Sequence, residues 1–388
     1  MPVLPYSRQT IDDDDVAAVT EVLRASLLTS GPVLPRFERA LAAAVGAPHV
    51  TACASGTAAL HLAYAALGIG PGDEIITSPI TFSATAAAAY YVGATVRIGD
   101  VDRAGNLSPD SVAELITPRT RAIVPVHLAG QPADLDELTR IARRRGLLLI
   151  EDACHALGAT YRGRPIGAGD SDAVVFSFHP VKHMTTGEGG AVVTRDPEVA
   201  RRVERLRNHG VERDPARLAG AAEGPWSYEV QELGWNYRLD EIGCALGLSQ
   251  LAKLDRFVHA RRMLAAAYRH ELQRVFPGAE VEAPAEKADR ESAYHLFAVA
   301  IDFARYRATR AQVMTRLAEV GIGTQVHYIP LLRHPLHRSR CASELSRERP
   351  GADRYYARTL SLPLYPGLAQ HDVARIADEL GRALGELR

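Results

Sequence analysis

The sequence predicts an α/β protein with a mostly parallel sheet covered on both faces by helices, followed by a smaller α+β unit. Strand and helix patterns alternate from about residue 50 to 207, which is typical of parallel strands joined by helices. Two long helical patterns follow, at Asp240 to Lys253 and Asp255 to Arg274. A segment rich in Pro, Ala and charge, residues 277–290, marks a loop before the smaller unit.

Apolar periodicity places the individual elements. Runs rich in β-branched residues predict buried strands near residues 74–77, 95–98, 121–126, 147–151, 172–178 and 190–194, and in the smaller unit near 294–302 and 324–328. Apolar residues at helical spacing predict helices near 57–67, 82–92, 108–116, 134–145 and 197–208. We expect a large domain over residues 1–250, and a linking helix with a small domain over residues 251–388.

Lys182 lies in a polar turn, Ser177 to Gly190, between two of these predicted strands. Flanking strands would fix its ammonium group, and partial burial would lower the pKa of that amine. A positioned, neutral lysine amine attacks carbonyl groups, as a Schiff-base lysine must. A lysine in a Gly-rich turn can also be a solvated loop charge, so other segments decide between the two interpretations.

Ser55, Gly56 and Thr57 follow the apolar stretch 49–54 and open a predicted helix. A helix N-terminus offers free N–H groups and the positive end of the helix dipole, and both bind phosphate. Gly56 would permit a close approach, and the two hydroxyl groups would add donors. The alternative is a plain N-cap by Ser55 or Thr57.

Asp152 and Phe82 follow predicted strands at the edge of the sheet where ligands of open α/β proteins gather. Asp152 would keep the ring nitrogen of pyridoxal phosphate (PLP) protonated and make the ring an electron sink, or would cap the next helix. Phe82 would stack on an aromatic cofactor, or pack in the core. With the helix start and Lys182, these residues predict a PLP site.

Six segments carry a resemblance to a known family: SGT, TF, EDACHALG, SFHPVK, TTGEGGAVV and GWNYRLDEI. They are similar to segments of the DegT/DnrJ/EryC1/StrS sugar aminotransferases, and the resemblance runs from about Tyr6 to the C-terminus. It implies the PLP-dependent transferase fold of type I, which is aspartate aminotransferase-like with a seven-stranded sheet. Segments 224–238, 245–251 and 325–328 are most similar to the C4 aminotransferases of the pseudaminic acid pathway.

The resemblance implies roles in the cofactor site. Lys182 would hold PLP as an aldimine and then move a proton, and the cofactor would pass through its pyridoxamine phosphate form. Ser177 would contact the cofactor phosphate, and His155 would lie against the ring. Asn236 would reach the cofactor phosphate of a partner subunit, which implies a homodimer with shared active sites.

The resemblance also implies contacts with a nucleotide sugar. The expected substrate contacts are Tyr6, Ser26, Leu27, Leu28, Thr29, Gly56, Ser177, Asn236, Gln325, Val326, His327 and Tyr328. Tyr6 would lie over an apolar sugar face, or only anchor the N-terminal segment. His327 would bond hydroxyl or pyrophosphate oxygens, or be a buried histidine satisfied by the backbone.

The implied reaction moves the amino group of L-glutamate to the C4 keto group of UDP-2-acetamido-2,6-dideoxy-β-L-arabino-hex-4-ulose. The products would be UDP-4-amino-4,6-dideoxy-N-acetyl-β-L-altrosamine and 2-oxoglutarate. Trp235 and the polar segment 338–349 depart from this pattern, which leaves open another nucleotide-linked keto sugar, carried by dTDP or GDP and reacting at C3 or C4.

Two other classes of function remain as alternatives. His179 and His183 are four residues apart, as in some metal hydrolases, but Pro180 disfavours the helix that would place them on one face. Some relatives carry histidine at the lysine position and act as dehydratases, and His183 directly follows Lys182 here. The motif from Ser177 to Lys182 nevertheless has lysine at that position, which favours transamination. A non-catalytic protein that retains a PLP-enzyme fold is the second alternative.

Composition sets further limits. The net charge of −1 argues against a nucleic-acid partner, and arginine clusters at 143–145 and 201–207 are interpreted as solvated helix faces. The longest apolar run, 84–96, is shorter than a membrane span needs. The four cysteines have no CxxC spacing and the N-terminus has no secretory pattern, so we expect a cytoplasmic protein without a metal site.

Overall fold

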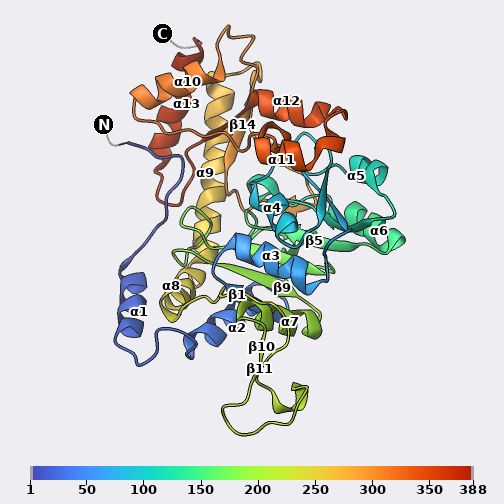
Figure 1. The fold of residues 1–388 in the computed structure, drawn as a ribbon. Helices are drawn as coiled ribbons and strands as arrows, with labels where there is room; N and C mark the ends of the chain where they lie inside the picture. The colour runs from blue at the N-terminus through green and yellow to red at the C-terminus, as the bar shows by residue number, and fades with distance from the viewer. Residues whose placement is uncertain (1–2, 386–388) are drawn as a thin grey trace.

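A computed structural model describes residues 3–385. A seven-stranded sheet lies at the centre of the large domain (Figure 1), with the order β1-β9-β8-β5-β4-β2-β3. Only β9 runs antiparallel to its neighbours. The strands are β1 (His49–Cys53), β2 (Glu74–Thr77), β3 (Thr95–Ile98), β4 (Thr120–Val124), β5 (Leu148–Asp152), β8 (Ala173–Ser177) and β9 (Gly190–Thr194). The expected α/β fold with a mainly parallel sheet is therefore confirmed.

Helices cover both faces of this sheet, which explains why its strands are apolar in consecutive positions. One face packs on α3 (Gly56–Ala66), α4 (Ala84–Tyr91) and α7 (Pro197–Arg207). The opposite face packs on α2 (Val33–Val45), α5 (Pro109–Leu115), α6 (Leu135–Arg145) and α8 (Glu241–Leu251). Within β8, Val175 joins the first layer, whereas Val174 and Phe176 join the second. Each large-domain strand and helix that was predicted is present within a few residues of the expected bounds.

The C-terminal half forms a smaller sheet with the order β12-β14-β15. Its strands are β12 (Val281–Glu282), β14 (Phe297–Ile301) and β15 (Thr359–Leu362), and its helices include α10 (Arg310–Glu319), α11 (Pro335–Arg340), α12 (Pro350–Arg358) and α13 (Gln370–Leu384). The predicted strand at 324–328 is wrong, because only Gln325 pairs with Ser361, by two backbone hydrogen bonds of 3.2 and 2.8 Å. The next residues turn away from the sheet toward the large domain.

The long helix α9 (Leu254–Val275) joins the two halves. Its Leu254 and Val258 pack with the large-domain core, whereas Leu264 and Tyr268 pack with the core of the C-terminal half. A domain boundary near residue 250 stays a proposal, since α9 contributes to both cores. Among residues 3–385, no helix is long and apolar enough to cross a membrane.

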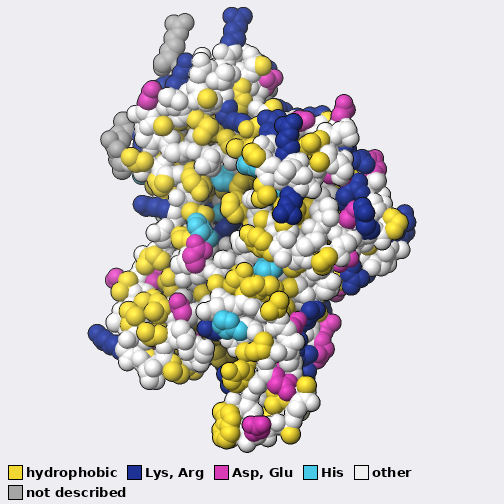
Figure 2. Space-filling model, viewed as in Figure 1, with side chains coloured by type: hydrophobic (Ala, Val, Ile, Leu, Met, Phe, Trp, Pro, Cys, Tyr) yellow, Lys and Arg dark blue, Asp and Glu magenta, His cyan; other side chains and the backbone are white. Residues whose placement is uncertain are grey.

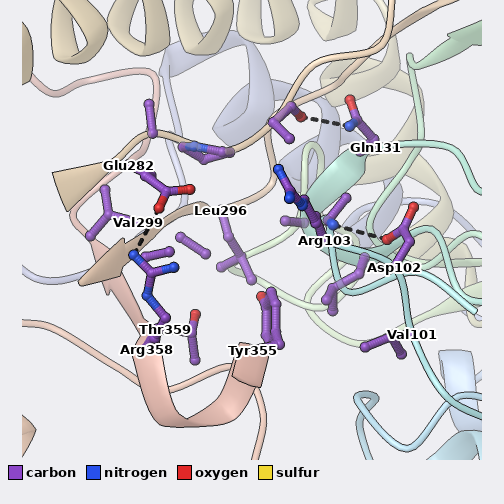
Figure 3. A pocket seen from close by; sticks show the side chains of 18 of the residues that line it. Val101, Asp102, Arg103, Gln131, Glu282, Leu296, Val299, Tyr355, Arg358 and Thr359 are labelled. Carbon is purple, nitrogen blue, oxygen red and sulfur yellow. Dashed lines mark hydrogen bonds and ion pairs between the residues drawn. The ribbon is translucent and has the colours of Figure 1, made fainter. Parts of the chain in front are cut away.

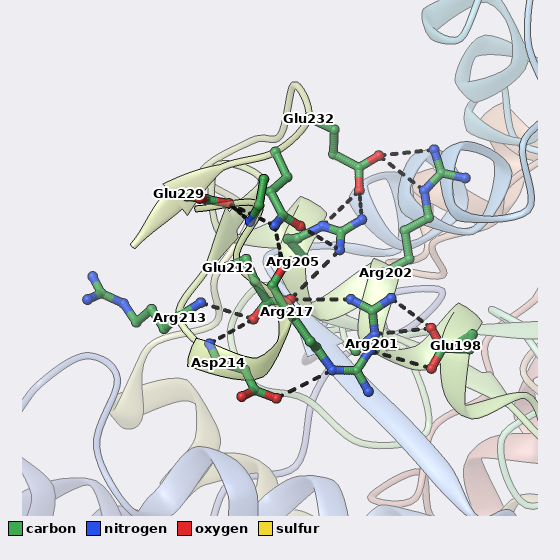
Figure 4. A network of polar contacts seen from close by, with 12 residues as sticks. Glu198, Arg201, Arg202, Arg205, Glu212, Arg213, Asp214, Arg217, Glu229 and Glu232 are labelled. Carbon is green, nitrogen blue, oxygen red and sulfur yellow. Dashed lines mark hydrogen bonds and ion pairs between the residues drawn. The ribbon is translucent and has the colours of Figure 1, made fainter. Parts of the chain in front are cut away.

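A hairpin of β10 (Val211–Glu212) and β11 (Glu229–Val230) projects from the large domain (Figure 1). Arginines of α7 bind acidic residues of this hairpin in the network drawn in Figure 4. Arg202 contacts Glu232 at 3.0 Å, and Arg201 contacts Glu212 at 3.3 Å. The interpretation of this arginine cluster as a solvated helix face is therefore wrong, because the guanidinium groups form ion pairs between α7 and the hairpin.

Candidate active site

Lys182 lies in the turn between β8 and β9, as predicted, and is partly buried. Its backbone N–H donates to His179 O at 2.9 Å, which fixes the start of the turn. Burial lowers the pKa of the Lys182 amine, although the neighbouring Cys154 and Asp152 oppose that shift. The amine is thus closer to its neutral, nucleophilic form than a solvated lysine is.

Asp152 ends β5 and is only 5% exposed. Its carboxylate accepts hydrogen bonds from Thr85 Oγ1 at 2.7 Å and from Cys154 N at 3.2 Å. No helix follows, so the helix-cap alternative is wrong. No cationic side chain of the described part of the chain lies within ion-pair distance of this carboxylate. A buried carboxylate without a counter-ion suits the protonated ring nitrogen of PLP.

The N-terminus of α3 meets the end of β8. Ser55 is the N-cap, and its Oγ accepts from Ala58 N at 3.1 Å. A Cβ atom added at Gly56 would lie 2.8 Å from Ser177 Cβ, so only glycine permits this approach. The N–H groups of Gly56 and Thr57 have no partner among residues 3–385. Free donors at a helix start beside Ser177 fit a phosphate group.

His155 lies three residues after Asp152 and is buried. Its Nδ1 accepts from Ala129 N at 3.4 Å, and its Nε2 lies 3.0 Å from Tyr328 Oη. Burial, with the Lys182 charge adding to it, holds the pKa of His155 well below its ordinary value, so the imidazole is neutral. Because a backbone N–H can only donate, we infer that the proton of the neutral ring resides on Nε2 and is donated to Tyr328 Oη.

Three further predicted residues lie near Tyr328. Phe82 is 61% exposed, so the core-packing alternative is wrong, and its ring centroid lies 6.2 Å from that of Tyr328. The ring centroid of Tyr6 lies 5.5 Å from that of His327. His327 is buried and its Nδ1 lies 2.8 Å from Ser361 Oγ, so a side chain satisfies it rather than the backbone.

Several expected contacts are not brought to this cluster within one chain. The loop from Ser26 to Thr29 is exposed and attached to α8 through Glu241 N, which donates to Leu28 O at 2.9 Å. Asn236 is exposed and forms a backbone bridge with Asn208. Gln325 is exposed at the edge of the small sheet, beside Val326. Their roles toward the cofactor or substrate stay predictions.

The structure adds residues that sequence reasoning missed. Thr85 donates a hydrogen bond to Asp152. The one feature of the sequence that could have indicated it is a hydroxyl side chain in an otherwise alanine-rich helix. His295 lies 4.3 Å from His155 between ring centroids, and 5.7 Å from His183. The Nδ1 atoms of His183 and His295 are buried without hydrogen-bond partners among the described residues. No periodic pattern marks His295, because only packing brings it to the site.

The space-filling view in Figure 2 shows a hollow with histidine and hydrophobic side chains gathered around it. The site combines a partly buried lysine amine, a buried carboxylate without a counter-ion, and free N–H donors at the start of α3 that can bind a phosphate group. These features together define a PLP-dependent enzyme site on an α/β transferase fold. PLP would be held by Lys182, Asp152 and the Ser55–Thr57 turn. The geometry is therefore compatible with the cofactor that the sequence predicted.

Comparison with known proteins agrees with this class. The DegT/DnrJ/EryC1/StrS aminotransferase family matches residues 9–381, and the chain belongs to this family. It is a sugar aminotransferase that uses PLP.

Two bacterial relatives and one further solved structure illustrate the similarity. The spore coat polysaccharide biosynthesis protein SpsC of Bacillus subtilis is 41% identical over 95% of this chain and 94% of its own. PseC of Helicobacter pylori, an aminotransferase involved in the biosynthesis of pseudoaminic acid, superimposes with a TM-score of 0.90 at 32% identity, over 98% of this chain and 99% of PseC. Spr1654 of Streptococcus pneumoniae, solved in a PLP form, has a TM-score of 0.88 at 27% identity, over 98% of both chains.

Proposed function

We propose that this enzyme moves the amino group of L-glutamate to the C4 keto group of UDP-2-acetamido-2,6-dideoxy-β-L-arabino-hex-4-ulose. The products are UDP-4-amino-4,6-dideoxy-N-acetyl-β-L-altrosamine and 2-oxoglutarate. The observation that carries the proposal is the Lys182 amine, partly buried beside a buried carboxylate, in a chain that superimposes on PseC with a TM-score of 0.90.

Each residue of the cluster has a chemical task in this proposal. PLP, when bound, supplies an electron sink for the pair of electrons left when a proton leaves the amino-donor carbon. Lys182 holds the cofactor between turnovers, and its Nζ then accepts that proton and delivers it to the cofactor carbon. Asp152 keeps the ring nitrogen protonated, and its bond from Thr85 Oγ1 fixes the orientation of the carboxylate.

Substrate binding in this proposal needs two subunits. Tyr6, His327 and Tyr328 border the Lys182 cluster within one chain. Asn236 and the loop from Ser26 to Thr29 are exposed, and we assign them to the active site of the partner subunit. The enzyme is then a homodimer, which acts in the cytoplasm with all four cysteines as free thiols, as they are in the structure.

A second candidate is transamination of another nucleotide-linked keto sugar, bound to dTDP or GDP and reacting at C3 or C4. The observation that favours it is the 41% identity to SpsC, whose name refers to a spore coat polysaccharide, against 32% to PseC. Both candidates use the same cofactor site and differ only in the sugar and nucleotide that they accept.

A panel of nucleotide sugars distinguishes the two candidates. Purified enzyme is incubated with L-glutamate and, separately, UDP-, dTDP- and GDP-linked 4-keto-6-deoxy sugars and a 3-keto sugar, and 2-oxoglutarate is measured. We expect kcat/KM to be highest for the UDP-linked β-L-arabino 4-keto sugar. Preferred turnover of a dTDP- or GDP-linked sugar, or of the 3-keto sugar, would establish the second candidate instead.

A further inference from the structure

A cavity of about 600 Å³ lies between the large domain and the C-terminal half of the chain. Its walls come from the loop after β3, from residues 128–131, from β12 and β14, and from α12. Figure 3 shows Arg103 and Arg358 on different sides of this cavity, with Leu296 and Tyr355 between them in the view. Its volume is within the range of sites that hold small organic ligands, roughly 300–1,000 Å³.

The acidic residues of this interdomain cavity already have cationic partners. Glu282 Oε1 accepts a hydrogen bond from Arg358 Nη2 at 2.8 Å. Asp102 accepts from Lys287 Nζ at 3.1 Å. Both carboxylates are thus paired within the protein, and Asp102 shares Lys287 with Asp134, whose Oδ1 lies 2.8 Å from Lys287 Nζ.

Arg103 and Arg354 also line the cavity and are exposed. Neither guanidinium has a hydrogen-bond or ion-pair partner among residues 3–385. The cavity thus has two guanidinium groups that no carboxylate of the described residues pairs with, so it favours an anionic ligand. Guanidinium groups are well suited to phosphate, which they bind through paired N–H donors.

The rest of the lining is largely apolar. Ala104, Ala283 and Pro284 contribute partly exposed apolar surface. The partly exposed Tyr355 contributes an aromatic ring. Such a surface binds a flat, poorly solvated group such as a nucleobase. We propose that the interdomain cavity binds a nucleoside phosphate as an effector, with its phosphate held by Arg103 and Arg354.

Two residues of the cavity wall also contact residues of the candidate active site. Ala129 N donates to His155 Nδ1 at 3.4 Å, and Tyr355 Oη donates to His327 O at 3.2 Å. A ligand that contacts both halves of the chain stabilises one arrangement of them over others. Occupancy of the cavity therefore changes how the active site binds its substrate, and the substrate reciprocally changes the affinity for the effector.

Calorimetric titration of the PLP-loaded enzyme tests the binding step with three probes: UMP, uridine and inorganic phosphate. We expect UMP to bind, and the double variant Arg103→Ala with Arg354→Ala to weaken its binding at least about tenfold. The double variant Arg103→Lys with Arg354→Lys keeps both charges and should bind more tightly than the alanine pair. The matched control is Arg145→Ala, which removes an exposed arginine of α6 outside the cavity.

A nucleotide can also bind where the nucleotide sugar binds, so the location needs its own comparison. Lys182→Ala should leave binding to the cavity unchanged, whereas the alanine pair should weaken it at least about tenfold. UMP binding to the alanine pair that is the same as binding to the wild-type enzyme, in affinity and in the number of sites, overturns the proposed site. Phosphate binding as tight as UMP binding overturns the nucleoside part of the proposal.

The effector step rests on the proposed aminotransferase activity and is tested separately. UMP should change KM for the nucleotide sugar at least about twofold in the wild-type enzyme, beyond any change that it causes in the alanine pair. Equal effects in the two proteins would overturn the effector role, because the nucleotide would then act only at the active site. The titration measures UMP binding directly, so its result does not depend on the identity of the sugar substrate.

Discussion

Tyr328 Oη lies 3.0 Å from His155 Nε2, and these residues are 173 positions apart in the sequence. Since the neutral His155 donates this hydrogen bond, the hydroxyl proton of Tyr328 is free to bond an acceptor on the cofactor or substrate side. Burial raises the pKa of Tyr328, so the phenol stays protonated at neutral pH. The pair joins the C-terminal half to the large domain at the candidate active site.

Tyr328→Phe removes this hydroxyl and retains the ring. We expect kcat to fall roughly fivefold, which corresponds to about 1 kcal/mol for one neutral hydrogen bond. Steady-state kinetics measure the change. The control is Tyr356→Phe, which removes the hydroxyl of a ring that lies against Arg310 and Arg333. A Tyr328→Phe enzyme as fast as the control would mean that the hydroxyl has no part in the reaction.

Lys182→Ala removes the amine that we assign to covalent attachment of PLP. The variant should lose turnover and the visible absorption of lysine-bound PLP, yet still retain the cofactor through the phosphate donors at the start of α3. Absorption spectra and cofactor content measure the two effects. Lys253→Ala, which removes a lysine paired with Asp12 and Asp15, should keep both properties. Normal transamination by Lys182→Ala would show the assignment to be wrong.

Asp152→Asn removes a negative charge with little change of shape. We expect kcat to fall at least about a hundredfold, on the order of 3 kcal/mol of transition-state stabilisation, because the ring nitrogen would no longer be held protonated. Asp170→Asn, at an exposed position, is the control. A near-wild-type rate would leave Asp152 a purely structural role.

Stability should fall as the pH drops below neutral. Burial lowers the pKa of His327 from 6.5 to about 4, so between these values the unfolded chain binds the proton more readily than the folded chain. This contribution is present above pH 6.5 and is lost as the pH falls toward 4. Between pH 7 and pH 5 it amounts to about 2 kcal/mol for His327 alone.

Urea unfolding of the PLP-loaded enzyme at both pH values measures this loss. His327→Gln should show a pH dependence that is shallower by about the same 2 kcal/mol. The burial that lowers the pKa of His155, His183 and His295 acts in the same direction, so the variant should retain part of the slope. An unchanged slope in His327→Gln would show that His327 titrates normally in the folded chain.

Mixing two inactive variants tests the shared site. If Asn236 serves the partner's cofactor phosphate, Asn236→Asp places a repelling carboxylate there, while Lys182→Ala disables its own subunit. A mixed dimer then has one site with both lesions and one with neither, so activity should return after subunit exchange. Confirmed exchange without recovered activity would place Asn236 in its own subunit's site or in none.

The local parts of the site followed from the sequence. The strand that ends at Asp152, the turn that holds Lys182 and the helix that begins after Ser55 each lie where short patterns predicted them. Strands buried on both faces produce uninterrupted apolar runs, and helix starts carry capping hydroxyls, so these elements leave a signal within a few residues. The cofactor could be predicted from the family motifs because its binding residues also occur in short segments of the sequence.

The less regular segments of the chain could not be predicted from the sequence. The segment 324–328 has an apolar pattern, but its backbone pairs with the small sheet only at Gln325 before the chain turns to place His327 and Tyr328. The hairpin of β10 and β11 is too short for a periodic signal. Its position depends on ion pairs with α7, and charge patterns alone resemble a solvated face.

The sequence by itself determined the class of fold, the order of the central elements and the lysine and carboxylate of the cofactor site. Only the tertiary structure decided the contacts among residues distant in the chain: Thr85 with Asp152, His295 with His155, and Tyr328 with His155. It also brought Arg103 and Arg354 to one interdomain cavity. Secondary structure leaves a local period in the sequence, whereas these contacts arise from the packing of whole elements, which leaves no period to read.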